Sequence, residues 1–135
     1  MKTILIVEDN PADSYLLEMA FREISNDISQ TVVRDGVEAM EYLLKRGAFA
    51  NAPDPDAVIL DLNMPRMDGR ELIRAVRNNC SLSHIPIVVF SGSSAKEEME
   101  QLKAEGIAHT YVKPSDLDAY FLQVRTFIHI LARCQ

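Results

Sequence analysis

Five short runs of apolar and β-branched residues, each followed by a segment with helical spacing, constrain this fold more than any other feature. We expect strands at residues 3–7, 30–33, 57–60, 86–90 and 110–112. Short continuous apolar runs are typical of strands buried on both faces, as in parallel sheets. Strands that alternate with helices predict a parallel sheet covered by helices on both faces. The chain is therefore expected to form a flavodoxin-like, doubly wound (βα)5 domain.

Helix signals lie where the alternation needs them. Asn10 followed by Pro11 predicts a capped helix over residues 11–24. Ser94 with Glu97 predicts a capping box for a helix after the fourth strand. A last helix is expected from about residue 116 into the C-terminus.

Length and charge narrow the function classes. A chain of 135 residues is expected to be a single domain, residues 1–135, with no output domain. Its net charge of −6 disfavours binding to nucleic acid or to an anionic membrane, since both need a basic surface. No segment approaches a membrane span and the amino terminus lacks a signal-peptide pattern, so we expect a cytoplasmic protein with no membrane partner.

Polar side chains follow four of the predicted strands directly. They are Glu8, Asp9, Asp61, Ser91 and Lys113. Because the carboxyl ends of parallel strands meet at one edge of the sheet, where ligands bind in α/β folds, these groups should converge. Three carboxylates held together repel one another more than one lysine can offset, and a divalent cation would relieve this. Asp9 and Asp61 are therefore predicted Mg²⁺ ligands, with Glu8 acting directly or through a water.

Such a site suits phosphoryl transfer. The transferred group spreads its charge over three oxygens, which need cations and hydrogen-bond donors around them. Asp61 can be the nucleophile and form an acyl phosphate. Mg²⁺, the Lys113 ammonium and the Ser91 hydroxyl would then contact the three oxygens.

The order and spacing of these residues resemble the receiver domain of two-component response regulators along almost the whole chain. The matching elements are the acid pair Glu8-Asp9, Asp61 within DLNMPRMDG, Ser91-Gly92, and Lys113-Pro114. Together they are highly specific, whereas each alone is weak.

The resemblance implies more than the residues do by themselves. It implies the strand order 2-1-3-4-5 and Mg²⁺-dependent transfer of a phosphoryl group from a histidine kinase's phosphohistidine to Asp61. The backbone carbonyl of Asn63 would be a further metal ligand. Ser91, Gly92 and Lys113 would bind the phosphoryl group, and the Ser91 hydroxyl would shift toward it on activation.

One position departs from the family pattern. Receivers usually carry an aromatic residue three positions before the lysine, which turns inward when the hydroxyl moves. Here that position is Thr110, and Tyr111 follows it. Either the coupling uses a smaller side chain or Tyr111 has taken another role.

The expected partners follow from the same resemblance. They are a sensor histidine kinase, similar to the phytochrome-type kinases, or a phosphotransfer protein, and a downstream protein. The last helix carries the apolar residues Tyr120, Phe121, Val124, Phe127, Ile128 and Leu131. Part of that stripe must pack on the sheet, and the remainder could serve a homodimer or a partner.

Three rival functions match parts of this pattern. A haloacid-dehalogenase-like phosphatase also uses a strand-end aspartate, but it needs a second acid two positions later, where this chain has Asn63. An FMN-binding flavodoxin needs a hydroxyl-rich phosphate loop after the first strand, where this chain is acidic. A pseudo-receiver that only binds partners is disfavoured by the complete set of polar groups. The favoured reading is a phosphoacceptor that signals rather than an enzyme with a separate substrate.

Overall fold

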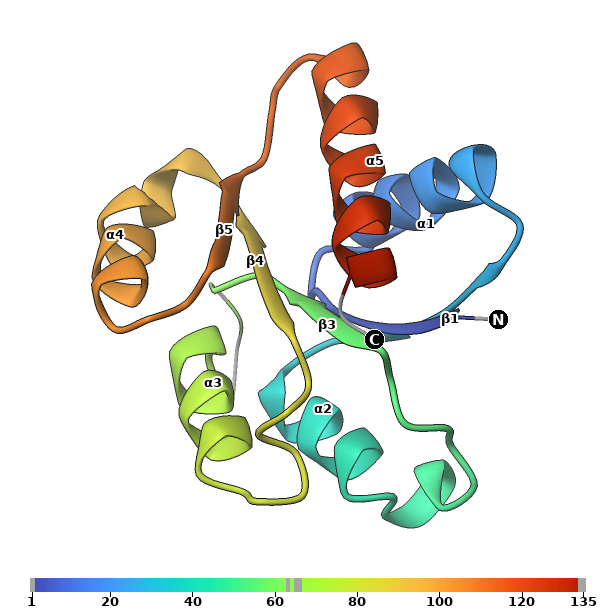
Figure 1. The fold of residues 1–135 in the computed structure, drawn as a ribbon, viewed down its shortest axis with the longest axis vertical. Helices are drawn as coiled ribbons and strands as arrows, with labels where there is room; N and C mark the ends of the chain where they lie inside the picture. The colour runs from blue at the N-terminus through green and yellow to red at the C-terminus, as the bar shows by residue number, and fades with distance from the viewer. Residues whose placement is uncertain (1, 63, 65–66, 134–135) are drawn as a thin grey trace.

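The structure, a computed structural model, describes residues 2–62, 64 and 67–133. These residues form five parallel strands, β1 (Lys2–Val7), β2 (Ile28–Val33), β3 (Ala57–Leu60), β4 (Ile87–Ser91) and β5 (His109–Val112). The strand order is β2-β1-β3-β4-β5 (Figure 1). The predicted doubly wound sheet and its order are therefore confirmed.

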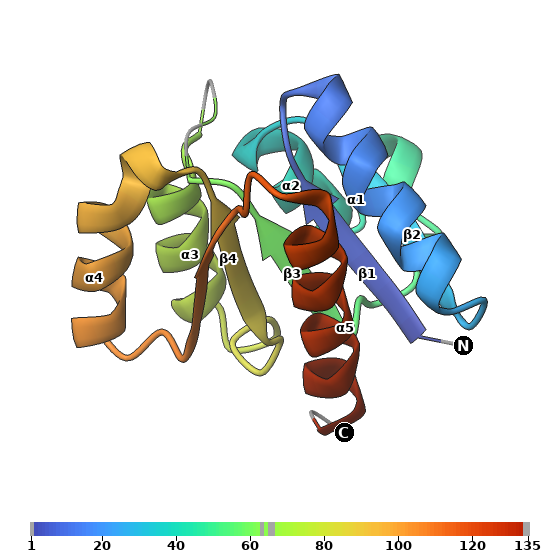
Figure 2. The ribbon, with the colours of Figure 1, turned by 90° about the horizontal axis from the view of Figure 1, so that it is seen from above.

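Helices cover both faces of this sheet, as Figures 1 and 2 show. They are α1 (Pro11–Ile24), α2 (Gly36–Leu43), α3 (Gly69–Arg77), α4 (Lys96–Ala104) and α5 (Leu117–Arg133). The pair α1 and α5 lies on one face, and α2, α3 and α4 lie on the other. No helix in the described part of the chain is long and apolar enough to cross a bilayer.

Each face of the sheet has its own hydrophobic core. Leu5, Val7 and Val89 face α2, α3 and α4, whereas Ile4 and Phe90 face α1 and α5. This alternation follows from the two-residue period of a strand and explains why the strand sequences are apolar throughout. The predicted α5 stripe belongs to the second core, either buried or packed against it. Most of the stripe is therefore a packing surface, whereas Phe121 and Ile128 are only partly buried.

Two helix starts were predicted from capping residues, and the structure confirms one and contradicts the other. The Asn10 side chain accepts hydrogen bonds from the N–H groups of Ala12 and Asp13, so the predicted cap of α1 is confirmed. The predicted Ser94 capping box is wrong, because a 3₁₀ turn (Ser93–Ala95) precedes α4 and no side chain caps that helix. Backbone hydrogen bonds within the 3₁₀ turn take the place of a side-chain cap at the start of α4.

Two glycines hold the segment after β3 against its neighbours. The Gly36 N–H donates to the Met67 carbonyl at 3.1 Å, and the Gly69 N–H donates to the Leu62 carbonyl at 3.1 Å. A Cβ at Gly69 would lie 2.8 Å from the Leu62 Cα and 2.9 Å from the Asp61 carbonyl oxygen. Only glycine permits this close approach, which fixes the backbone around Asp61.

Candidate functional site

The sheet brings the predicted site residues together by continuing its hydrogen bonds past the strand ends. The Glu8 N–H donates to Val33, the Asp61 N–H to Val7, and the Lys113 N–H to Ser91, at 3.0, 3.1 and 2.8 Å. These bonds fix the backbone of three site residues at one edge of the sheet. The side chains consequently start from rigid positions rather than from loose loops.

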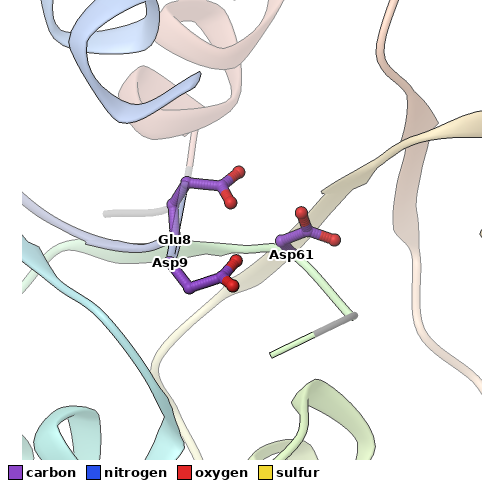
Figure 3. A group of neighbouring side chains, drawn as sticks. All are labelled: Glu8, Asp9 and Asp61. Atoms are coloured by element: carbon purple, nitrogen blue, oxygen red, sulfur yellow. The ribbon is translucent and has the colours of Figure 1, made fainter. Parts of the chain in front are cut away.

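Three carboxylates converge at this edge (Figure 3). Glu8, Asp9 and Asp61 each offer one oxygen, and these oxygens lie within 4.8 Å of one another. Glu8 is buried, Asp61 is partly buried and Asp9 is exposed. Hard oxygen donors in this number, with one side open to water, fit Mg²⁺, which usually keeps several waters. The predicted ligand Asn63 lies outside the described residues.

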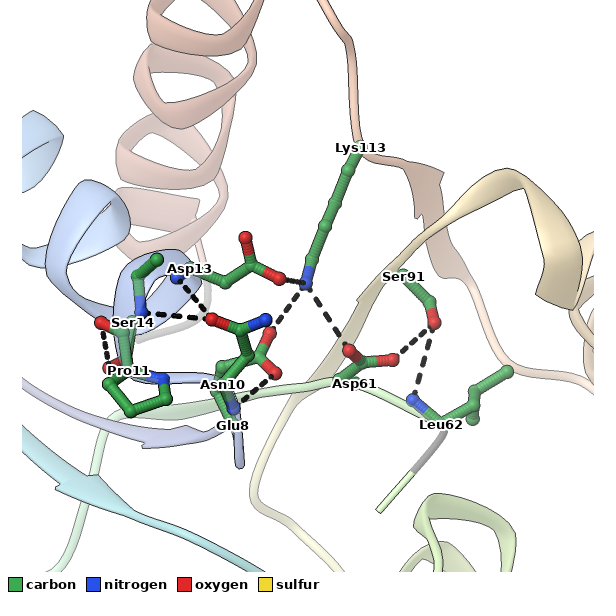
Figure 4. Close-up of polar contacts among 10 residues, drawn as sticks. Glu8, Asn10, Pro11, Asp13, Ser14, Asp61, Leu62, Ser91 and Lys113 are labelled. Atoms are coloured by element: carbon green, nitrogen blue, oxygen red, sulfur yellow. Dashed lines mark hydrogen bonds and ion pairs between the residues drawn. The ribbon is translucent and has the colours of Figure 1, made fainter.

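The Lys113 ammonium lies among carboxylates from three elements (Figure 4). Its Nζ is 2.5 Å from Glu8 Oε1, 3.3 Å from Asp61 Oδ2 and 3.3 Å from Asp13 Oδ2. The Lys113 side chain is only 16% exposed. The structure thus places Lys113 beside Asp61, as predicted, and adds Asp13, which the prediction missed.

Asp13 was missed because the motifs just before it, the Glu8-Asp9 pair and the Asn10-Pro11 helix start, do not include it. It lies in the first turn of α1, on the segment that Asn10 caps. The available signal was indirect: a helix that begins two residues after a strand-end acid pair must bring its first turn to the same edge of the sheet. An acid in that turn is also the usual choice beside a helix N-terminus, and so it did not stand out.

Ser91 is fully buried and contacts Asp61 from the side opposite Lys113 (Figure 4). Its hydroxyl donates to Asp61 Oδ1 and accepts from the Leu62 N–H at 3.4 Å. Gly92 follows in extended backbone, with open space where a Cβ would lie. The Asp61 carboxylate is thereby held between a hydroxyl donor and an ammonium.

Thr110 and Tyr111 point to opposite faces of the sheet, since they are consecutive residues of β5. Tyr111 packs on Phe127 of α5, with ring centroids 5.3 Å apart, and its ring stacks on His109. The Thr110 hydroxyl is buried and has no hydrogen-bond partner in the described part of the chain. Tyr111 therefore packs in the core between the sheet and α5, whereas Thr110 lies on the opposite face of the sheet.

Replacing Thr110 by Val is expected to raise the free energy of unfolding by about 1 kcal/mol. The substitution removes a buried hydroxyl that lacks a partner while nearly preserving side-chain shape. Urea unfolding followed by circular dichroism measures the change. Thr126 is the matched control, because its exposed hydroxyl donates to the Leu122 carbonyl and its replacement by Val should bring no gain. A destabilised Thr110→Val protein would contradict the expectation.

Burial raises the pKa of the Glu8 carboxyl to about 7 in the metal-free protein. The Lys113 ammonium opposes this shift and the Asp61 carboxylate adds to it, but loss of hydration is the largest cause. The Lys113 pKa is raised, because its carboxylate partners outweigh the burial that would lower it. A carboxyl that ionises reluctantly beside a strongly held ammonium marks this edge as an electrostatically unusual site.

The raised pKa of Glu8 predicts a pH dependence of stability in EDTA. The folded chain holds this proton more tightly than the unfolded chain. The stabilisation of the folded state by protonation of Glu8 is therefore complete below about pH 4.5 and is lost as pH rises toward 7. The free-energy advantage of Glu8→Gln over the unmodified protein should consequently grow across that range, by on the order of 2 kcal/mol. Chemical unfolding of both proteins at several pH values measures it, with Glu18→Gln as control. An advantage that stays constant with pH would contradict the expectation.

Comparisons with known proteins agree on the family. The family model described as the response regulator receiver domain matches residues 4–125. The curated response regulator Rcp1 of Synechocystis sp. is 38% identical over 98 residues, which are 73% of this chain and 67% of Rcp1.

Two solved structures are also similar. The phosphorylated cyanobacterial phytochrome response regulator RcpA has a TM-score of 0.87 at 34% identity, and the alignment covers 97% of this chain and 94% of RcpA. The Mn²⁺-bound form of Rcp1 has a TM-score of 0.84 at 32% identity, covering 94% of this chain and 91% of Rcp1.

Proposed function

Because this chain belongs to the response regulator receiver domain family, we propose that Asp61 accepts a phosphoryl group from a sensor histidine kinase and that the altered protein surface passes on the signal. One observation carries this proposal. The Asp61 carboxylate lies between the Ser91 hydroxyl and the Lys113 ammonium, next to the carboxylates of Glu8 and Asp9. Donors for the phosphoryl oxygens and ligands for a cation thus surround the proposed nucleophile.

The proposed step moves one phosphoryl group. A carboxylate oxygen of Asp61 attacks phosphorus as the bond from phosphorus to the kinase's imidazole nitrogen breaks. The imidazole leaves with the bonding electron pair, and Asp61 becomes an acyl phosphate. Lys113 and the Ser91 hydroxyl, which now contact the two carboxylate oxygens, would donate to phosphoryl oxygens and stabilise their charge.

Glu8, Asp9 and Asp61 would hold Mg²⁺, together with the Asn63 carbonyl that the family resemblance implies. When bound, Mg²⁺ would neutralise charge on the phosphoryl oxygens and align the reactants. Support for the metal comes from the donor set of this chain and from the Mn²⁺-bound form of Rcp1.

The proposed kinase is of the phytochrome type. Support comes from the similarity to RcpA, which is described as a phytochrome response regulator. Radiolabelled phosphate on purified phytochrome-type histidine kinases should move to this protein within seconds to minutes, and a kinase from another sensor class should transfer far more slowly. Equal transfer from both would contradict the assignment of the kinase, and no transfer from any kinase would contradict the phosphoacceptor function.

The rival functions have less support. A haloacid-dehalogenase-like phosphatase is not supported by the family match. The acyl phosphate is proposed to form and hydrolyse on this chain without turnover of a separate small substrate. Sustained release of phosphate from phosphate esters would speak for the phosphatase.

The readout is proposed to use the small Thr110 side chain. Tyr111 is held against Phe127 on the other face of the sheet, so it is poorly placed to follow a movement of Ser91. Of the two alternatives that the sequence left open, we therefore propose the smaller side chain.

A second copy of the chain is the proposed occupant of the outer face of α5. Leu117 and Leu122 are 56% and 65% exposed there, beside Asp118, Phe121 and Arg125, around a cavity of about 410 Å³. In an antiparallel two-fold pair of α5 helices, Asp118 of one copy would face Arg125 of the other. Leu122→Glu should consequently shift any dimer to monomer in sedimentation velocity, whereas Glu23→Gln should not.

Two further expectations belong to this proposal. Residues 1–135 are proposed to act as one receiver domain that signals through its surface, supported by the alignment over 94% of RcpA. A cytoplasmic location is proposed from the match to the response regulator receiver domain family. No binding to nucleic acid or membrane is expected, as the net charge of −6 suggests.

A further inference from the structure

Asp13 contacts the site without belonging to its expected residues. Its carboxylate oxygen Oδ2 lies 3.3 Å from the Lys113 Nζ, across 100 residues of sequence. The Asp13 side chain is 44% exposed, whereas that of Glu8 is 6% exposed. Among the described residues, the ammonium therefore has two largely buried partners, Glu8 and Asp61, and one more exposed partner, Asp13.

The common occurrence of acids at the start of a helix does not by itself explain the contact between Asp13 and Lys113. In a capping box, a Glu or Gln at the third helical position reaches back to the N–H of the capping residue. Here the Asn10 N–H donates to Glu8 Oε2 at 3.3 Å instead, and the Asp13 carboxylate turns toward Lys113. The Asn10 cap and Pro11 fix the first turn of α1, so Asp13 is presented from a rigid element.

Glu8 and Asp61, the other described partners of Lys113, have further proposed roles that Asp13 lacks. Glu8 and Asp61 belong to the group whose oxygens could hold a cation, and Asp61 is the proposed nucleophile. Asp13 is outside that group. The contact between Asp13 and Lys113 can therefore persist when the metal binds and when Asp61 is phosphorylated.

We propose that Asp13 is a positioning residue for Lys113: it holds the ammonium at the solvent side of Asp61, where a phosphoryl oxygen arrives. The inference rests on the proposed phosphoacceptor function. Figure 4 shows the Lys113 ammonium between Asp13 and Asp61, within reach of both. Without Asp13, the flexible lysine would keep, among the described residues, only the two partners that are shared with the cation, and fewer of its conformations would be productive.

The first test is the rate of phosphorylation by acetyl phosphate in saturating Mg²⁺. Asp13→Ala should slow it about ten-fold, because a charge-assisted contact that orients a donor is lost. Asp13→Glu should restore most of the rate, since it returns the carboxylate. Glu23→Ala removes an exposed acid from the same helix and should leave the rate unchanged.

The second test asks whether Asp13 acts through Lys113. In a Lys113→Ala background, Asp13→Ala should have no further effect on the residual rate, as a double-mutant cycle requires of a residue that works through its partner. In the metal-free protein, the ¹⁵N NMR signal of the Lys113 ammonium should broaden or shift in Asp13→Ala and return in Asp13→Glu.

The outcomes separate the two proposals. If the unmodified protein gains no phosphoryl group, the proposed function fails, and the ammonium signal still tests whether Asp13 holds Lys113. If the unmodified protein is phosphorylated but Asp13→Ala reacts at an equal or higher rate, the positioning role is overturned. Equal slowing by Asp13→Ala with and without Lys113 would overturn it as well.

Discussion

Replacing Asp61 by Asn is expected to abolish phosphoryl uptake. Asn keeps the size and shape of the side chain but is a poor nucleophile and cannot form the acyl phosphate. The other carboxylates of the site, those of Glu8, Asp9 and Asp13, cannot substitute, because Ser91 donates only to Asp61 among them. Incubation with acetyl phosphate and Mg²⁺, followed by phosphate-affinity electrophoresis, measures the uptake.

The control for Asp61→Asn is Asp54→Asn. The Asp54 side chain is 73% exposed, in the surface segment before β3, and makes only a surface ion pair with Lys45 in the described part of the chain. It should leave uptake unchanged. Retained uptake in Asp61→Asn, with the phosphoryl group on another acid, would refute the assignment of the nucleophile.

Replacing Lys113 by Ala is expected to slow phosphorylation about a hundred-fold, the usual cost of removing one preorganised donor from a developing anion. The ammonium contacts Asp61 at 3.3 Å and has little exposure to water, which strengthens its effect. Its loss also leaves Glu8 without its closest cation, so Glu8 should bind a proton more readily. Time courses with acetyl phosphate measure the rate.

Lys103→Ala provides the matched control for Lys113→Ala. Lys103 lies on α4, its side chain is 52% exposed, and it pairs only with Glu100 among the described residues. Its replacement should change the rate less than two-fold, because surface ion pairs contribute little free energy. A Lys113→Ala protein that folds normally and reacts as fast as this control would remove Lys113 from the proposed reaction.

The strands, their alternation with helices and most of the site could be predicted because they depend on short-range patterns, whereas the strand order came from the family resemblance. A buried parallel strand leaves a simple mark, a short apolar run, and the residue after it must lie at the carboxyl edge. That reasoning alone placed Asp61, Ser91 and Lys113 together, and the structure confirms the placement. The sequence pattern works here because topology, rather than side-chain detail, decides the positions.

What the sequence could not give depends on packing between elements. The contact of Asp13 with Lys113 depends on where the first turn of α1 lies relative to the carboxyl end of β5, and two residues 100 positions apart in the sequence do not reveal it. The Ser94 capping box failed because the chain forms a 3₁₀ turn first. The exposed apolar residues of α5, Leu117 and Leu122, lie outside the stripe that the sequence singled out.

The central claim is that the carboxylates at this edge hold a magnesium ion and that Asp61 then accepts one phosphoryl group. Intact-mass spectrometry after treatment with acetyl phosphate tests it most directly, with Mg²⁺ in one sample and EDTA in the other. With Mg²⁺ the protein should gain the mass of one phosphoryl group, located on Asp61 by peptide mapping, and in EDTA its mass should not change. An unchanged mass with Mg²⁺, or an equal gain in EDTA, would contradict it.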